Sequence, residues 1–386
     1  MPLDFNFTEE QELFRRTLRE FAEEEIKPKS AYWDENEEFP WEDVKKMAKM
    51  GLLSLYIPTE YGGQGADHVA VGIATEEIAR IDCLHGTLLN VAAEEAHVIS
   101  HYGTDEQKEK WFPPIVRGEK VFVIAVTEPE CGSDVSQIKS KAERVGSNYV
   151  LNGEKQFITF VVPEGLSLTY VKTDPGKRAR GVSAFVLPLD TPGVKRYRLK
   201  GMGLRGSSWG GFTMSDVRIP KDMLVGEENK GFYYLMSGLD FERALIALRC
   251  LGTAQSAIED AVEYAKNRIV FGKSLAKYEE IQFRTVEMYT CMEAARLLAY
   301  KALWMMDQGV RATKWASMAK WFGSEIAFKA INWSIQVHGA LGYSREHPEE
   351  KRLRDVRALT LGGGTTEVTK IVISRELFGK EYLPYK

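Results

Sequence analysis

The 386-residue sequence has little of what marks several large classes of protein. It contains four cysteines, Cys83, Cys131, Cys250 and Cys291, and no pair of them has the C-x-x-C spacing of zinc knuckles and redox motifs. Without such a pair we predict no metal site. The sequence contains no run of eighteen apolar residues, so we expect no membrane span. The formal net charge of −4 gives no dense cationic face for nucleic acid, so we expect no nucleic-acid partner.

The first residues resemble neither common type of targeting segment. They read MPLDFNFTEEQ, which lacks the basic and then apolar pattern of a signal peptide and is acidic, unlike an Arg-rich transit peptide. A mature chain whose presequence has been removed stays compatible with this pattern. Together with unpaired cysteines, it favours a cytoplasmic protein whose thiols are free.

What is present is an ordinary globular composition, with 44% apolar and 27% charged residues, arranged as helix, strand and helix again. Residues 1–120 show helical spacing, and Thr8 with Gln11 can form a capping box at the first helix. Residues 121–230 consist of short β-rich runs separated by turn pairs such as Asn152-Gly153, which predicts a small antiparallel barrel or sandwich.

Residues 231–386 are again helical, and two apolar stripes indicate a four-helix bundle. The first stripe runs through Leu251, Ala254, Ile258, Ala261, Val262 and Ala265. The second runs through Trp315, Ala319, Phe322, Ile326, Ala330, Trp333 and Val337. The predicted fold class is therefore α+β, with a helical domain, a β-domain and a helical bundle in that order.

One motif in the β-rich region imitates a dinucleotide-binding site. Gly201 to Gly206 match G-x-G-x-x-G, but such a site needs a helix directly after the motif, so that phosphate meets the helix N-terminus. Here the β-like run SSWGGFTMSDVRIP follows. We therefore interpret these residues as a glycine-rich turn.

Four separated motifs resemble signatures of one enzyme family. They are VTEPECGSD at 126–134, KQFIT at 155–159, R-x-x-F-G-K at 268–273, and QVHGALGY at 336–343 followed by RLRD at 352–355. In this order, and with the α–β–α arrangement, nearly the whole chain resembles the acyl-CoA dehydrogenase family. Two small departures are Ala340, where Gly or Ser is usual, and Gln137, where a small residue is usual.

The resemblance implies an FAD bound between the β-domain and the helical bundle. The flavin would accept a hydride from the substrate β-carbon while a carboxylate removes the α-proton. Positions matching flavin contacts are Val126, Thr127, Ser133, Phe157 and Thr159, of which Ser133 also matches a thioester contact and Phe157 replaces the usual Trp. Arg268 and Phe271 match contacts to the FAD of a neighbouring subunit. Further FAD contacts are matched by Gln336, Gly339, Thr365 and Glu367.

The catalytic base of many relatives is absent from its usual place. The family's C-terminal Y-E-G-T turn corresponds to Gly362 to Thr365, so Gly363 occupies the position of the usual Glu. A minority of the family, including isovaleryl-CoA dehydrogenase, carries the Glu in an L-D-x-E-R segment, which matches Leu239 to Arg243 and puts the base at Glu242. On a helix face shared with Leu245 and Ile246 the carboxylate would be desolvated and its pKa raised. The alternative is a surface pair of Glu242 with Arg243.

The resemblance also assigns the residues that would hold the thioester. The backbone N–H at Gly363 matches a donor to the thioester carbonyl, and glycine keeps that N–H. Asp240 and Arg243 match positions that contact the CoA moiety.

The helix expected near residues 87–95 matches the family's pocket-lining helix. Thr87, Asn90, Val91 and Glu94 would share one face of it. An inward Glu94 would shorten the pocket, recognise a polar or cationic group or take part in proton transfer, whereas the alternative is a solvated Glu94 beside Glu95.

These matches predict the dehydrogenation of a short branched or cyclic acyl-CoA, with electron-transferring flavoprotein as redox partner and a homotetramer as the assembly. Three alternatives stay open. The LDFER segment also resembles that of crotonobetainyl-CoA reductase, which runs the reverse direction. A dehydrogenase for carrier-protein thioesters is a second alternative, and a non-catalytic FAD-binding homologue is the third.

Overall fold

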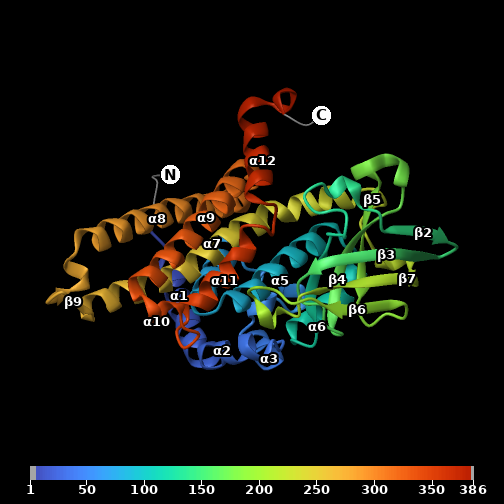
Figure 1. Ribbon diagram of the computed structural model, residues 1–386. Helices are drawn as coiled ribbons and strands as arrows, with labels where there is room; N and C mark the ends of the chain where they lie inside the picture. The colour runs from blue at the N-terminus through green and yellow to red at the C-terminus, as the bar shows by residue number, and fades with distance from the viewer. Residues whose placement is uncertain (1–5, 384–386) are drawn as a thin grey trace.

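The structure is a computed structural model that describes residues 6–383, and it has three parts in the predicted order (Figure 1). This confirms the α+β fold class. The first part is helical and ends before Val121, where the first strand begins. Its helices are α1 (Glu9–Phe21), α2 (Lys27–Asn36), α3 (Trp41–Lys49), α4 (His68–Ile81), α5 (Cys83–Tyr102) and α6 (Asp105–Val116).

Local capping explains where several of these helices begin. The predicted capping box at α1 is confirmed, because Thr8 Oγ1 accepts from the Gln11 N–H at 3.2 Å and Gln11 Oε1 accepts from the Thr8 N–H at 3.0 Å. At α5 the carboxylate of Asp82 accepts from the N–H groups of Leu84 and His85. This cap fixes the start of the helix that carries Glu94.

The middle part is one sheet whose strands follow the order β6-β7-β3-β2-β4-β5-β8, with β1 beside β4. The sheet is mixed in detail, because β1 pairs with β4 in parallel, from Val121 opposite Gly165 to Ala125 opposite Thr169. No hairpin joins β1 to β4, so nothing forces them to be antiparallel. The strands are β1 (Val121–Ala125), β2 (Lys141–Val145), β3 (Asn148–Ile158), β4 (Gly165–Lys172), β5 (Val182–Pro188), β6 (Val194–Arg198), β7 (Gly210–Pro220) and β8 (Leu224–Val225).

The glycine-rich segment at 201–206 lies between β6 and β7, so a strand follows it, as predicted. Its glycines serve close packing. A Cβ at Gly203 would lie 2.3 Å from the backbone carbon of Arg354, and the N–H of Leu204 donates to the carboxylate of Asp355. The segment therefore docks the sheet on the C-terminal helices.

The third part is the helical bundle, built around α7 (Figure 1). The predicted stripe on α7 is buried through Leu251, Ala254, Ile258 and Ala261, and the long helix packs against α4, α5, α8, α9 and β5. No helix within residues 6–383 combines the length and apolarity needed to cross a membrane. The elements are α7 (Gly231–Asn267), β9 (Ile269–Val270), β10 (Lys273–Ser274), α8 (Glu279–Asp307), α9 (Thr313–His338), α10 (Ala340–Tyr343), α11 (Glu349–Leu359) and α12 (Thr366–Phe378).

Buried charges join the three parts. The ammonium of Lys351 on α11 lies 2.9 Å from the Asp82 carboxylate and 2.8 Å from that of Asp355, which also binds Leu204 of the middle part. Burial alone would raise the pKa of Asp82, but Lys351 and His85 hold that pKa below its ordinary value. A charged pair removed from water in this way fixes one arrangement of the three parts, because breaking it would leave a buried charge alone.

We expect Gly252→Ala to loosen the contact of α7 with α4. A Cβ at Gly252 would lie 2.2 Å from the backbone oxygen of Glu76, so the two helices must separate. We expect the free energy of unfolding to fall by about 1–3 kcal/mol, measured by urea denaturation. The control is Gly176→Ala in an exposed turn, where the nearest atom is Asp174 Oδ1 at 3.4 Å. Equal unfolding midpoints for the two variants would contradict the close packing.

Candidate functional site

Glu242 of α7 and Gly363 of the turn before α12 lie side by side. A Cβ at Gly363 would be 3.3 Å from Glu242 Oε2 and 2.5 Å from Ile246 Cδ1. Gly363 also has a φ of +64°, which favours glycine. The structure therefore puts the carboxylate of α7 next to the position from which the usual family Glu would project.

Two cationic side chains hold this turn through its backbone carbonyls. Arg243 Nε donates to the Gly363 oxygen at 3.1 Å. Lys320 Nζ of α9 donates to the oxygens of Thr360 and Gly364, at 3.1 and 2.6 Å. The three hydrogen bonds determine where Gly363 lies relative to Glu242.

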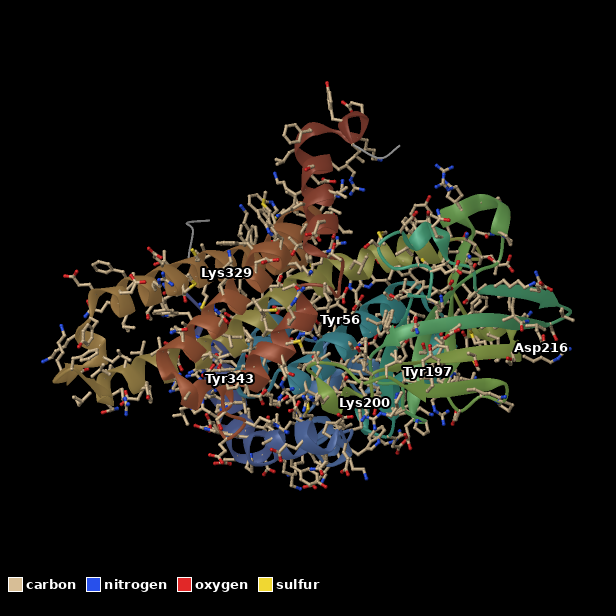
Figure 2. All side chains as sticks on the ribbon, in the orientation of Figure 1. Tyr56, Tyr197, Lys200, Asp216, Lys329 and Tyr343 are labelled. Carbon is tan, nitrogen blue, oxygen red and sulfur yellow. The ribbon has the colours of Figure 1, made fainter. Side chains whose placement is uncertain are left out.

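The sequence interpretation missed Lys320, although a signal was present. Its side chain is fully buried, and it belongs to the same face of α9 as Ala316 and Ala327. A lysine on a face of small apolar residues needs buried partners. Lys329, by contrast, lies nine residues further along α9 and is exposed (Figure 2).

The surroundings of Glu242 suit a proton-transferring carboxyl group. Burial raises its pKa, and Arg243, Arg249 and Lys320 together offset only part of that rise. The predicted alternative, a surface pair of Glu242 with Arg243, is wrong. Arg243 is buried, and among the ion pairs of residues 6–383 its partner is Asp240, at 3.6 Å.

Asp240 lies one helical turn before Arg243 and is partly buried. One of its carboxylate oxygens accepts from the hydroxyl of Thr313. Burial raises its pKa, and Thr313 and Arg243 offset part of that rise. Asp240 and Arg243 thus stand together at the edge of the site, next to Glu242.

Helix α5 turns acidic side chains toward α7. Glu94 and Glu95 are 2% and 1% exposed, so the prediction of a solvated Glu94 is wrong and the inward orientation is correct. A Cβ at Gly238, one turn before Glu242, would lie 3.4 Å from Glu94 Oε1. Burial raises the pKa of both carboxyls well above the ordinary value, and Glu242 adds to the effect.

Thr87, the other α5 residue predicted to bind substrate, is also buried. Its hydroxyl donates to the backbone oxygen of Cys83 at 2.8 Å, within its own helix. The structure therefore gives the side chain of Thr87 a structural hydrogen bond and leaves Glu94 as the acidic group on this face.

The residues predicted to contact the flavin gather where β1 ends beside β3. Lys155 Nζ donates to the Val126 oxygen at 3.0 Å, and the Gln156 N–H donates to the Thr127 oxygen at 2.9 Å. Thr159 is partly buried beyond the end of β3, and Ser133 lies in an exposed loop.

An aromatic pair stands beside these residues. Phe157 is half exposed with a φ of +62°, and its ring stacks on Trp209 with centroids 5.3 Å apart and planes at 22°. A solvent-facing aromatic surface of this kind fits the face of a flavin. The sequence interpretation missed Trp209. A signal was present, because Trp209 directly precedes two glycines in a β-rich run, and a large aromatic residue at such a place often serves a surface contact.

A second cluster lies far from Glu242. Arg268, Gln336 and Gly339 line a cavity of about 700 Å³ at the C-terminal end of α7, and Phe271 at the tip of the β9–β10 hairpin is 94% exposed (Figure 1). Since α7 rises about 1.5 Å per residue, this end lies about 39 Å along the helix from Glu242. Tyr343, also part of a matching motif, is the last residue of α10 and is exposed (Figure 2).

Thr365 and Glu367 occupy the start of α12. Thr365 is the N-cap, and its hydroxyl accepts from the Val368 N–H at 3.3 Å, while Glu367 is exposed in the first turn. Thr365 follows Gly363 by two residues and Glu367 by four, so both lie at the end of the chain segment that forms the Glu242 site.

Comparison with known proteins agrees with this geometry. Models of the N-terminal, middle and C-terminal domains of acyl-CoA dehydrogenase match residues 8–119, 123–217 and 229–378. The chain is 40% identical to 3-(aryl)acrylate reductase of Clostridium sporogenes, over 96% of this chain and 99% of that one. It is 40% identical to the subunit CarC of the caffeyl-CoA reductase-Etf complex of Acetobacterium woodii, over 97% and 100%.

The fold also matches a solved structure, that of butyryl-CoA dehydrogenase from Megasphaera elsdenii. The TM-score is 0.94 at 33% identity, covering 97% of this chain and 100% of that one. The resemblance seen in the sequence motifs is thereby confirmed, and the chain belongs to the acyl-CoA dehydrogenase family of FAD-dependent oxidoreductases.

Proposed function

We propose that this protein transfers a proton and a hydride at the α- and β-carbons of an acyl-CoA thioester, with Glu242 as the proton-transferring group. The observation that carries the proposal is the position of the Glu242 carboxylate, 3.3 Å from where a side chain at Gly363 would begin. A carboxyl group from α7 thus replaces the missing one of the turn. Its raised pKa supports the same role.

The residues of the chain divide the work of the proton transfer. In dehydrogenation the Glu242 carboxylate takes the α-proton, and the backbone N–H of Gly363 donates to the thioester carbonyl as negative charge develops there. Arg243 and Lys320 hold Gly363 in place for this contact. Bound FAD would supply the acceptor for the β-hydride, and Val126, Thr127 and Thr159, where β1 ends beside β3, would hold it. Asp240 and Arg243 at the edge of the site bind the CoA moiety.

We propose that the acyl group is short and branched or cyclic, on the resemblance of the L-D-x-E-R segment to that of isovaleryl-CoA dehydrogenase. The reverse reaction, reduction of an α,β-enoyl thioester, is a second candidate. It is favoured by the two relatives at 40% identity whose names say reductase. In that direction protonated Glu242 would deliver its proton to the α-carbon.

We further propose electron-transferring flavoprotein as the redox partner. The support is the relative from Acetobacterium woodii, whose name places it in a complex with such a flavoprotein. Measuring reduction of a purified electron-transferring flavoprotein by the enzyme with acyl-CoA, and enoyl-CoA reduction by the reduced flavoprotein, separates the two directions. Thioesters of a carrier protein are tested beside the CoA forms. Faster reaction with the carrier-protein thioester would favour the alternative of a dehydrogenase for carrier-bound substrates.

A homotetramer would complete the FAD site. Arg268 and Phe271 lie too far from Glu242 to reach the same flavin within one chain, so they would contact the FAD of a neighbouring copy. The outer face of α8 is exposed and apolar, which supports contact with other copies. Its exposed residues include Phe283, Val286, Leu297 and Trp304.

We expect Glu242→Gln to lower the rate of flavin reduction by acyl-CoA about 10²- to 10⁴-fold, because glutamine cannot accept the α-proton. FAD binding should be unchanged. The measurement is anaerobic bleaching of the flavin absorbance with a panel of acyl-CoAs, and the exposed substitution Glu109→Gln serves as the control. An unchanged rate in Glu242→Gln would remove this residue from the mechanism.

We expect Lys320→Met to change the pH profile of oxidation as well as its rate. The Lys320 charge lowers the pKa of Glu242, so its loss raises that pKa and moves the acidic limb of kcat/KM to higher pH. Burial lowers the pKa of Lys320 itself to about 8. Above that pH the wild type loses the Lys320 charge, so its activity should fall. The variant has no such charge to lose and should lack this basic limb of the pH profile.

The matched control for this pH experiment is Lys329→Met, at the exposed position of the same helix. A merely structural role of Lys320 would lower the amount of folded protein and leave the pH profile of the remaining activity in place. That outcome, with FAD content retained, would contradict the positioning role.

We expect Arg268→Glu to lower the FAD content of the purified protein, because a carboxylate there would repel a diphosphate. The readout is the ratio of flavin to protein absorbance after gel filtration, with light scattering for the oligomeric state. Arg16→Glu, at an exposed position of α1, is the control. Equal FAD content in both variants would contradict the assigned contact.

A further inference from the structure

We propose that α5 carries a hydrogen-bonding subsite, formed by Asn90, Glu94 and Glu95, that binds an uncharged hydroxyl group on the acyl chain of the substrate. This inference rests on the proposed function, because it names the class of acyl group that the same site takes. It concerns side chains that the proton transfer itself does not use.

The first observation is a set of buried polar atoms that have no protein partner. Asn90, Glu94 and Glu95 are each at least 98% buried. Within residues 6–383, no hydrogen bond reaches Asn90 Oδ1, Asn90 Nδ2, Glu94 Oε2 or Glu95 Oε2. Buried polar groups are costly when they are unpaired, so four such atoms on one stretch of helix indicate a polar guest.

The second observation places Glu94, with Asn90 on the same helix face, beside the reacting centre, while Glu95 lies near enough for Glu242 to act on it electrostatically. Asn90 lies one turn before Glu94 on α5. Glu94 touches α7 at Gly238, where a Cβ would be 3.3 Å from its Cγ and 3.4 Å from its Oε1. Gly238 in turn precedes Glu242 by four residues, about 6 Å along the helix. An acyl chain whose α-carbon lies at Glu242 therefore reaches Glu94 within a few carbon–carbon bonds.

The side chains of Asn90, Glu94 and Glu95 favour an uncharged group that both donates and accepts hydrogen bonds. The amide of Asn90 offers donors and an acceptor, and a carboxyl group that is protonated offers the same. Burial raises the pKa of Glu94 and of Glu95 well above the ordinary value, which favours the protonated forms.

Charged guests fit this surrounding less well. A cationic substituent would lie near Arg243 and Arg249, which act electrostatically on Glu94. An anionic substituent would be removed from water close to the carboxyl group of Glu242, which carries a negative charge when it takes the α-proton. An alcohol or phenol satisfies the amide and the carboxyls without adding a charge.

The specificity follows from the polar atoms that an apolar acyl group would leave without hydrogen bonds. A methyl group in the same place would cover Asn90 and Glu94 without pairing them, and sites built to bind a hydroxyl reject such analogues strongly. The subsite therefore determines which acyl-CoA is bound, whereas Glu242 determines the chemistry.

The test compares thioesters that differ in one hydroxyl group and have equal size. The pairs are 4-hydroxybutyryl-CoA with valeryl-CoA, and 3-(4-hydroxyphenyl)propionyl-CoA with 3-(4-methylphenyl)propionyl-CoA. Binding is measured on the FAD-loaded Glu242→Gln protein by titration of the flavin absorbance, so that affinity is read without turnover. We expect the hydroxylated member of at least one pair to bind about tenfold or more tightly.

Substitutions at Glu94 identify the source of the preference. Adding Glu94→Leu should abolish or invert the preference, whereas Glu94→Gln, which keeps hydrogen-bonding capacity, should retain most of it. Glu109→Gln is the control and should leave the preference unchanged. Because Glu94→Leu only replaces a buried polar group with an apolar one, its FAD content and unfolding midpoint report whether it folds; if it does not fold, the same comparison is made with Asn90→Leu.

The outcomes separate this inference from the proposed function. Equal affinity within both pairs, while the wild-type flavin is still bleached by an acyl-CoA, would overturn the subsite and leave the function standing. Tighter binding of 4-aminobutyryl-CoA than of 4-hydroxybutyryl-CoA would overturn the assignment of an uncharged group. No bleaching by any thioester, and no oxidation of the reduced flavin by the corresponding enoyl thioesters, would overturn the proposed function instead.

Discussion

The geometry of the candidate site depends on the hydrogen bonds that two buried cations make to one backbone turn. Thr360 is the C-cap of α11, so its carbonyl and those that follow have no helical partner. Lys320 satisfies the oxygens of Thr360 and Gly364, and Arg243 satisfies that of Gly363. A positive charge at the C-terminal end of a helix is also favourable to its dipole. The same two side chains thereby complete α11 and position the residue that faces Glu242.

This arrangement couples the charges of the site to one another. The carboxyl groups of Glu94 and Glu242 both lie near Arg243 and Arg249, and that of Glu242 also lies near Lys320, while burial makes each charged form costly by itself. Lys320 shows the coupling most directly, since burial lowers its pKa to about 8 while Cys250 and Glu242 favour its charged form. Adding or removing one charge, including that of a bound substrate, therefore changes the pKa values of the others.

The sequence was sufficient for features that depend on nearby residues. The capping box at Thr8, the buried stripe on α7 and the strand after the glycine-rich turn all follow from short-range patterns. The parallel pairing of β1 with β4 was not predictable in this way, because it joins distant segments. Helical spacing placed Glu94 on a face of α5, but only the packing of α7 shows that this face is covered. The role of Lys320 depends on a turn forty residues away in sequence.

The absence of a side chain at Gly363 and the presence of Glu242 are two aspects of one packing constraint. A Cβ at Gly363 would lie 2.5 Å from Ile246 Cδ1 and 3.3 Å from Glu242 Oε2, so a side chain there would move the end of the Ile246 side chain aside and would meet the Glu242 carboxyl. The φ of +64° at Gly363 disfavours any L-side chain there as well. With glycine in the turn, the carboxyl group beside it is the one that α7 carries. Because α7 also carries Gly238 against Glu94, the Glu242 carboxyl lies in fixed relation to that face of α5. In the mechanism we propose, a base on α7 therefore links the proton transfer to the hydroxyl-binding subsite on α5.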